Sequence, residues 1–191
     1  MPFATLLKTG MRNGISPSSY GTSSGKVLVL SAITGVAFDN DQVKEGLFTS
    51  PFTPDQFVST QEFLICRGNG NKSLVGCGRF PTISLHDTVF PDTMIAAGVD
   101  PSQVAPLFLE RLWSTDCVRR QIENGARTTN GTYKINQKVL AAIELPVPPM
   151  SEQMRFAEVA ARVGLAHRQA SAELSNTLFD ALVQRAFRGE L

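Results

Sequence analysis

The sequence predicts a mixed α/β domain over residues 1–149, followed by one long α-helix over residues 150–191. Residues 1–150 hold short apolar runs of strand length, which many Gly, Pro, Ser and Asn residues interrupt. Residues 151–188 instead carry apolar side chains at steps of three and four, which places them on one face of a helix. Pro148 and Pro149 separate the two patterns. A chain of 191 residues suits such a domain with one extension.

Within the domain, four apolar runs are expected to form strands: residues 27–30, 63–66, 74–80 and 93–99. A one-sided apolar stripe predicts a helix from Pro106 to Ile122, which Asn124 and Gly125 end. Residues 137–142 predict one short helical turn and residues 143–147 a last strand. The prolines within residues 51–57 favour a loop there.

The long helix carries a narrow apolar seam. Ser151 is expected to cap its N-terminus, with Glu152 in the first turn, where the helix dipole favours an acid. At 1.5 Å per residue the helix is about 55 Å long, which exceeds the expected diameter of the domain. We therefore predict a spacer that pairs with a second copy as an antiparallel coiled coil and makes the chain a homodimer. The residues expected in this contact are Phe156, Val159, Val163, Ala166, Ala170, Leu174, Leu178 and Leu182. An amphipathic helix packed on its own domain is the alternative.

Charge is unevenly distributed along the chain. The formal net charge of +1 argues against strong nonspecific binding to nucleic acid, because neutralising phosphates requires Lys and Arg. However, residues 63–86 contain three basic residues and no acid, and residues 117–143 contain five basic residues and one acid. This segregation predicts one basic face, and charges dispersed over solvated loops are the alternative.

No catalytic or metal-binding pattern is present in the sequence. A phosphate loop has glycine immediately before its lysine, whereas Asn71 stands at that position here. Many nucleases carry an acid two residues before a lysine, and no lysine of this sequence has one. Three cysteines without CxxC spacing and two histidines do not suit a zinc site, so no metal or cofactor is expected. Free thiols favour a reducing cytoplasm. The sequence lacks an apolar run long enough to predict a membrane span.

Three polar loops are predicted to contact DNA. Their Ser, Thr and Tyr hydroxyls suit phosphate contacts, whereas Arg and Asn can pair with the edges of guanine and adenine. The first loop contributes Arg12, Asn13, Ser16, Ser18, Ser19 and Tyr20, and the second contributes Arg67, Asn69, Asn71 and Lys72. The third contributes Arg127, Thr128, Thr129, Asn130, Thr132, Tyr133 and Lys134. The Asn-Gly pair at 130–131 is also a strong signal for a hairpin turn. For each residue, a solvated loop position is the alternative.

Four segments resemble the specificity subunits of type I restriction-modification systems. They read FLICRGNGNKSLVG (63–76), FPDTMI (90–95), ARTTNGTYKINQKVLAAIELPVPPMSEQ (126–153) and, at the end of the chain, FRGEL. The resemblance implies a target-recognition domain of α/β fold, which reads double-stranded DNA in the major groove and has no catalysis of its own. The implied partners are adenine methyltransferase subunits and a restriction subunit, with the long helix as a ruler and docking surface.

Subunits of that family carry two recognition domains and two helical regions, whereas this sequence has one of each. The sequence is therefore expected to be a half-length form or a truncated product. A half-length form is expected to pair with itself and to read two inverted half-sites. Two other functions are the alternatives: a protein-interaction module that binds no DNA, and an antirestriction decoy that binds the methyltransferase without reading DNA.

Overall fold

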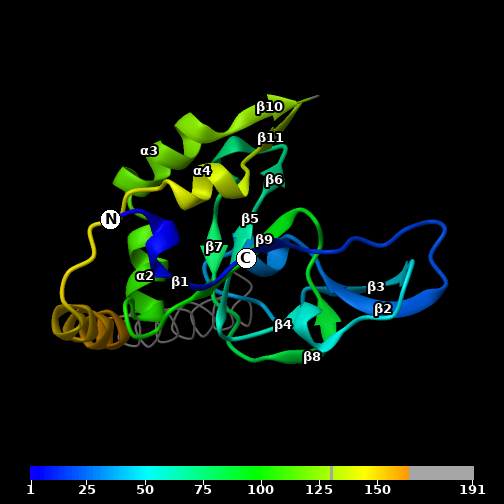
Figure 1. Ribbon diagram of the computed structural model, residues 1–191, viewed down its shortest axis with the longest axis horizontal. Helices are drawn as coiled ribbons and strands as arrows, with labels where there is room; N and C mark the ends of the chain where they lie inside the picture. Colours follow the sequence, from blue (N-terminus) through cyan, green and yellow to red (C-terminus); the bar gives the residue numbers. More distant parts are fainter. Residues whose placement is uncertain (130, 164–191) are drawn as a thin grey trace, which may run out of the picture.

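The computed structural model describes residues 1–129 and 131–163, which form a mixed α/β structure around one central sheet (Figure 1). Asn130 and five predicted dimer-contact residues, Ala166, Ala170, Leu174, Leu178 and Leu182, lie outside the described residues. The strands of the central sheet are antiparallel, in the order β1 (Leu7–Asn13), β9 (Met94–Val99), β5 (Glu62–Cys66) and β7 (Gly78–Arg79).

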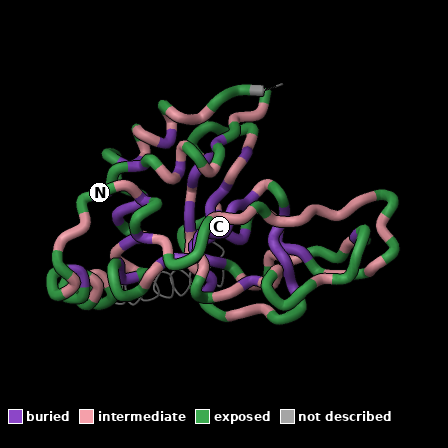
Figure 2. Tube along the Cα trace, viewed as in Figure 1, coloured by how far each residue is buried: buried purple, intermediate pink, exposed green. Residues whose placement is uncertain are grey.

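The central sheet is buried on both faces, as Figure 2 shows for its inner strands. Side chains alternate along a strand, so Phe63 and Ile65 of β5 face one core while Leu64 and Cys66 face the other. Every residue of β9 is buried. The continuous apolar runs 63–66 and 93–99 are therefore strands, as predicted, because each must supply two cores at once.

Helices cover the face of the first core, and a second sheet lies beyond the other core. The covering helices are α2 (Pro106–Trp113), α3 (Asp116–Gly125) and α4 (Gln137–Ala141), together with the 3-10 helix η1 (Phe3–Leu6). The second core contains α1 (Ser31–Thr34) and residues of the second sheet. That sheet has the order β3 (Val43–Phe48), β2 (Ser23–Leu28), β8 (Leu85–Val89) and β4 (Phe57–Val58).

A third, small sheet carries two of the predicted DNA-contact loops. Its order is β10 (Arg127–Thr129), β11 (Thr132–Lys134) and β6 (Gly68–Asn69). The hairpin of β10 and β11 projects at the top of Figure 1, directly after α3. The hairpin signal in the sequence is thus confirmed, and Gly131 has the positive φ of 74° that such a turn requires.

The predicted helix from residue 106 to 122 is wrong, because two helices stand there. The backbone of Thr115 is extended, with ψ of 154°, and this ends the α-helical path between α2 and α3. Asp116 then occupies the first turn of α3, where the helix dipole favours an acid. The order Ser114-Thr115-Asp116 is itself a helix-start pattern, so the sequence contained the signal for this break.

Other element boundaries also differ from the predictions. Residues 74–80 contain a turn and only the two-residue strand β7, and residues 143–147 form a single bridge between Glu144 and Pro2. The loop predicted near residues 52–57 includes the 3-10 helix η2 (Pro54–Gln56). Strands β1, β3 and β8 were missed, because none of them is a strongly apolar run. The predicted strand at residues 27–30 is β2, shifted toward the N-terminus, and the predicted turn at 137–142 is α4.

Gly76 forms the turn that joins β5 to β7. Its φ of +74°, together with the hydrogen bond from Cys77 N–H to Leu74 O at 3.1 Å, makes residues 74–77 a type II turn. Gly76 N–H donates to Cys66 O at 2.7 Å, while Cys66 N–H donates to Cys77 O at 2.8 Å. This is the bulge in which glycine takes the left-handed position. An added Cβ at Gly76 would lie 2.5 Å from Cγ2 of Ile122 in α3.

Residues 150–163 are helical. Ser151 was predicted as the N-cap, and this is wrong, because the helix already includes residue 150 and the N–H groups of Glu152 and Gln153 donate to Pro149 O. The predicted continuation to residue 188 lies outside the described residues. In the described part of the chain, no helix is both long and apolar enough to cross a membrane.

Replacing Gly76 with Ala is expected to lower the free energy of unfolding. The left-handed backbone alone costs about 1–2 kcal/mol for a residue with a Cβ, and the contact with Ile122 adds to this. Urea denaturation monitored by circular dichroism measures the change. Gly10→Ala is the matched control, because Gly10 lies in β1 with no atom within 4 Å of an added Cβ. Equal losses in the two variants would contradict the argument.

Candidate nucleic-acid interface

The third sheet joins two predicted DNA-contact loops that lie far apart in the sequence. Strand β11 pairs with β10 on one side and with β6 on the other, where Tyr133 is opposite Asn69 and Lys134 is opposite Gly68. Ile135 N–H donates to Arg67 O at 2.9 Å and extends this pairing. The loop at 67–72 and the hairpin at 127–134 therefore form one continuous surface (Figure 1).

Strand alternation separates the side chains of this sheet into two faces. Ile135 is buried in the first core and Tyr133 packs against the same core, so Lys134 points to the opposite, solvent side. Arg127 is directly opposite Lys134 across the hairpin and shares its face. Two like charges in this arrangement repel each other. An anion bound beside both side chains would remove that repulsion.

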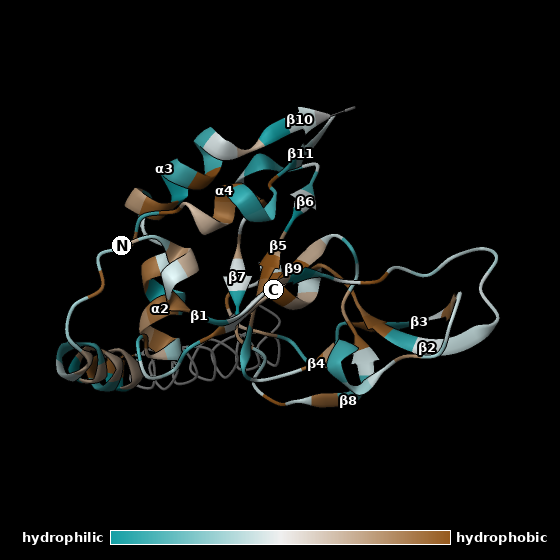
Figure 3. Ribbon diagram, in the orientation of Figure 1, coloured by the Kyte–Doolittle hydropathy of each residue, from teal (hydrophilic) through white to brown (hydrophobic). Residues whose placement is uncertain are grey.

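Five basic side chains, here called the basic surface, gather on and beside the third sheet. They are Arg67, Lys72, Arg127, Lys134 and Lys138, and none forms an ion pair with another described residue. The ion-paired cations of the described chain, such as Lys26 with Asp87 at 2.6 Å, are a separate set. In that exposed pair, the hydrogen bond between the partners raises the pKa of Lys26 and lowers the pKa of Asp87. Figure 3 shows hydrophilic colouring along much of α3 and the start of β10.

Asp92 links the first predicted loop to the second. Its carboxylate accepts a hydrogen bond from the Ser16 hydroxyl, and its backbone carbonyl accepts one from the Arg67 guanidinium at 3.1 Å. Nearby, the side-chain amide of Gln137 at the start of α4 donates to Asn13 Oδ1 at 3.1 Å. The segment from Asn13 to Ser16 therefore lies beside the basic surface.

The remainder of the first loop lies against the second sheet instead. Ser18 N–H donates to Leu47 O of β3 at 2.8 Å, and the side chain of Tyr20 is 90% exposed. Ser19 is exposed next to it. The structure thus divides the predicted loop between two places.

Arg12 and Asn13 were predicted in a loop, and this is wrong, because both belong to β1. The Arg12 guanidinium pairs with the Glu62 carboxylate through two contacts, of 2.7 and 3.1 Å, and lies over the Phe90 ring at 4.6 Å from its centroid. Its charge is thereby balanced within the fold. The sequence gives no local sign of this contact, since Glu62 and Phe90 are distant along the chain.

The two asparagines of the second loop shape the turn that contains them. Asn69 Oδ1 accepts from Asn71 N–H at 2.8 Å, and Asn71 Oδ1 accepts from the N–H and the hydroxyl of Ser73 at 3.0 and 2.8 Å. Bidentate recognition of adenine requires both the oxygen and the nitrogen of the amide. Because both oxygens already accept hydrogen bonds, the asparagines are poorly prepared for that role. Lys72, in the 3-10 helix η3 (Lys72–Leu74), is exposed.

The third loop forms the hairpin described above. Arg127 and Thr128 are exposed residues of β10, Thr129 ends that strand, and Thr132 begins β11. Lys138 of α4 was not among the predicted contacts. It lies with Arg127, Asn124 and Asn136 along a groove of about 550 Å³ between α3, β10 and α4. The acid-poor run 117–143 was the sequence signal that contained it.

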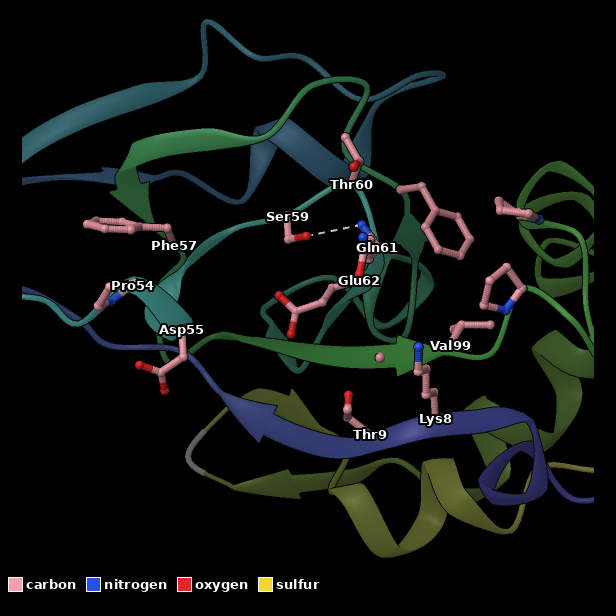
Figure 4. Close-up of a pocket in the computed structure, with 14 residues that line it drawn as sticks. Lys8, Thr9, Pro54, Asp55, Phe57, Ser59, Thr60, Gln61, Glu62 and Val99 are labelled. Atoms are coloured by element: carbon pink, nitrogen blue, oxygen red, sulfur yellow. Dashed lines mark hydrogen bonds between the residues drawn. The ribbon is translucent and has the colours of Figure 1, made fainter.

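A second hollow, of about 710 Å³, lies at the end of the central sheet (Figure 4). Its charged lining residues are Lys8, Asp55 and Glu62, and the Glu62 carboxylate is held by Arg12. Ser59 Oγ accepts a hydrogen bond from Gln61 N–H at 3.2 Å, drawn as a dashed line. This lining does not pair a nucleophile with a base, so it does not suggest catalysis.

The cysteines and acids of the described chain offer no obvious redox or metal chemistry. Cys66 is free and buried, and burial raises the pKa of its thiol to about 12, which keeps the thiol neutral. Cys77 and Cys117 are also free. Among the described residues, no three His, Cys, Asp or Glu side chains are grouped so as to hold a metal ion.

Comparison with known proteins places the chain beside one class of subunit. It is 25% identical over 191 residues to the specificity subunit of the type I restriction enzyme EcoKI from Escherichia coli K12, an alignment that covers 96% of this chain and 41% of the relative. It is 26% identical over 142 residues to the StySPI specificity subunit from Salmonella potsdam, covering 70% of this chain and 30% of the relative. The chain spans less than half the length of these relatives. No protein-family model matches it.

Solved structures agree in fold. The S subunit of a type I restriction-modification system from M. genitalium has a TM-score of 0.57 at 13% identity, and covers 100% of this chain with 46% of its own. The HsdS subunit from Thermoanaerobacter tengcongensis has a TM-score of 0.56 at 18% identity, with 100% and 45% covered. A structure described for the assembly and conformational transition of a type I system has a TM-score of 0.57 at 19% identity, with 100% and 46% covered. The resemblance seen in the motifs is thus confirmed in sequence and in fold.

Arg12 differs from the cations of the basic surface, because its ion pair with Glu62 gives it a structural role. Arg12→Ala is expected to lower the free energy of unfolding by about 1.5–3 kcal/mol, because Glu62 loses two hydrogen bonds to a charged partner. Lys134→Ala should change it by less than about 0.5 kcal/mol, as is usual at an exposed position without partners. Chemical denaturation of both variants provides the measurement. A stable Arg12→Ala protein would show that the pair does not hold β1 and β5 together.

Proposed function

We propose that this chain reads DNA sequence as a specificity component of a type I restriction-modification system, and that it has no catalytic activity of its own. The observation that carries the proposal is the similarity to type I specificity subunits along nearly the whole chain, joined to the same fold. The basic surface supplies a chemical reason for DNA as the ligand. The proposal needs no cofactor, and three free thiols favour the cytoplasm.

The proposed partners are double-stranded DNA, adenine methyltransferase subunits and a restriction subunit. A subunit without catalytic groups can act only by bringing DNA to others that carry them. The two alternatives from the sequence, a module that binds no DNA and an antirestriction decoy, are not favoured. Neither explains why unpaired cations from three separate segments gather on one surface.

The basic surface is proposed to contact the phosphates beside the bases that are read. Each phosphate contact made by Lys or Arg releases condensed counterions and strengthens binding without regard to sequence. The repulsion between Arg127 and Lys134 is relieved when a phosphate lies beside them. A two-stranded hairpin is also narrow enough to enter the major groove, which brings Thr128 and Thr132 toward base edges.

Methylation mapping tests the function as a whole. The chain is expressed with its methyltransferase subunits in cells that lack other adenine methylation, and modified adenines are located by sequencing. The expected result is methylation at one defined bipartite motif, which disappears without the chain. Unchanged methylation in the presence and absence of the chain would overturn the proposal.

Lys134→Ala and Lys138→Ala are expected to weaken binding to all duplexes alike. Loss of one phosphate contact should reduce the slope of log affinity against log salt concentration by about 1. Fluorescence anisotropy of a labelled duplex over a range of salt concentrations measures both quantities. Arg111→Ala is the matched control, because Arg111 is an exposed cation on α2 outside the basic surface. The same loss in the control would mean that only total charge matters.

We further propose that two copies pair through the helix that begins at residue 150. Phe156, Val159 and Val163 are large apolar side chains that are 43%, 55% and 63% exposed in the single chain. An exposed apolar stripe on a helix favours a partner. Paired copies would present two identical readers about a two-fold axis, so the motif would be two inverted half-sites around an unread spacer.

Val159→Glu with Val163→Glu is expected to give a monomer, because the pairing would bring carboxylates together in an apolar seam. Analytical ultracentrifugation compares this variant with the unmodified chain. Arg162→Glu is the control, since it places a carboxylate on an exposed residue of the same turn that is not in the seam. A dimer that survives in the double variant would refute this interface, and an asymmetric methylation motif would refute the pairing of identical readers.

A further inference from the structure

The side chain of Gln153 is a polar group buried where the helix leaves the domain. It is 1% exposed, and it is the only buried residue among residues 150–163 of the described helix. A buried amide is stabilising only when its hydrogen-bonding capacity is met, and otherwise a hydrocarbon side chain would serve better. A glutamine at this position therefore requires a reason.

Every polar group of the Gln153 amide meets a different backbone partner. Its Oε1 accepts from Ala105 N–H at 2.9 Å, and its Nε2 donates to Gln103 O at 3.1 Å and to Pro148 O at 2.8 Å. Ala105 is the N-cap residue of α2, which has no cap from its own side chain. One side chain thus connects the helix to the start of α2 and to the proline segment that precedes the helix.

The geometry allows a single orientation of this amide. Rotating it by half a turn would direct Nε2 at the Ala105 N–H, donor against donor, and Oε1 at a carbonyl oxygen. The T-shaped contact between Phe156 and Phe108, with ring centroids 5.5 Å apart, adds a second point of attachment one turn further along. Two attachments on successive turns define both the direction of the helix axis and its rotation.

We propose that Gln153 is a positioning residue that sets the angle between the DNA-reading domain and the helix. A helix rises 1.5 Å per residue, so residue 163 lies about 15 Å beyond Gln153, and a tilt of about 10° at the first turn displaces it by roughly 2.5 Å. The displacement grows along any continuation of the helix. This inference deepens the proposed function, because whatever pairs with the helix is thereby placed at a fixed position relative to the bases that are read.

Double electron–electron resonance, which measures the distance between two spin labels, reports this angle on the full chain. One spin label is attached to the exposed native Cys117 of α3 and another to Arg162→Cys, with Cys77 replaced by Ser. Labelled chain is diluted with unlabelled chain, so that distances between copies do not contribute. We expect one narrow distance distribution in this reference protein.

Gln153→Met keeps the approximate shape and removes all three hydrogen bonds, and Gln153→Glu keeps the acceptor but removes both donors. Both variants should broaden the distance distribution or shift it by several ångströms. Glu152→Gln, an exposed change on the same turn, should leave it unchanged. Should Gln153→Met fail to fold, Gln153→Asn, which keeps the amide on a shorter arm, replaces it. A narrow, unshifted distribution in the Gln153 variants would overturn the proposal.

A functional readout separates positioning from general stability. In the complete complex, Gln153→Met should bind DNA within about twofold of the unmodified chain, while methylation falls at least tenfold or occurs at more than one spacing. Equal losses of DNA binding and methylation would indicate a merely structural role and count against the inference. If the unmodified chain binds no DNA, the proposed function fails, but the distance measurement still decides the role of Gln153.

Discussion

Backbone carbonyls between residues 73 and 76 hold α2 and α3, two of the covering helices, on the central sheet. Trp113 of α2 donates its indole N–H to Gly76 O at 2.7 Å, and Arg119 of α3 donates to Val75 O at 2.8 Å and to Ser73 O at 2.9 Å. The same turn follows Lys72, while α3 runs directly into β10. The two halves of the basic surface are therefore positioned by one turn, and that turn depends on the left-handed backbone of Gly76.

Charge distribution explains how a nearly neutral chain presents a basic surface. The net charge is +1, yet four of the acids are held in ion pairs. Glu62, Asp87, Glu110 and Glu123 pair with Arg12, Lys26, Arg79 and Arg119, respectively. The Arg119–Glu123 pair lies within α3, which leads into β10, and the other three pairs involve residues outside the third sheet and α4. The cations on the third sheet and α4 have no carboxylate partner among the described residues, so no ion pair within the fold competes with a ligand for them. Net charge alone is consequently a poor guide to nucleic-acid binding in this chain.

The arrangement separates the proposed DNA-contact surface from the helix that begins at residue 150. The third sheet and its neighbours supply a projecting hairpin and the basic side chains that are proposed to contact phosphates. The helix that starts at residue 150 is attached to α2 through the contacts of Gln153 with Ala105 and of Phe156 with Phe108. Both depend on the first core, because α2, α3 and α4 all pack against it.

Local patterns in the sequence were sufficient to predict the buried strands at 63–66 and 93–99, the hairpin turn at 130–131 and a helix that begins near residue 150. Each of these depends on apolar runs, on turn residues or on a proline break, which act over a few neighbours. Four motifs were sufficient to reveal the resemblance to type I specificity subunits, which the sequence and fold comparisons confirm. The edge strands β1 and β3 escaped detection because their stability comes from pairing rather than from their own composition.

Only the tertiary structure decided which charged residues are ion-paired within the fold and which have no such partner among the described residues. Arg12 and Arg67 are equivalent in the sequence, each beside Asn and Gly in a polar segment. The fold brings Glu62 to the first, and it brings β11 with Lys134 to the second. Lys138 joins the same surface because α4 packs beside α3 and β10. The physical reason is that ion pairs form between residues that are distant along the chain, and local sequence patterns do not specify which distant residues meet.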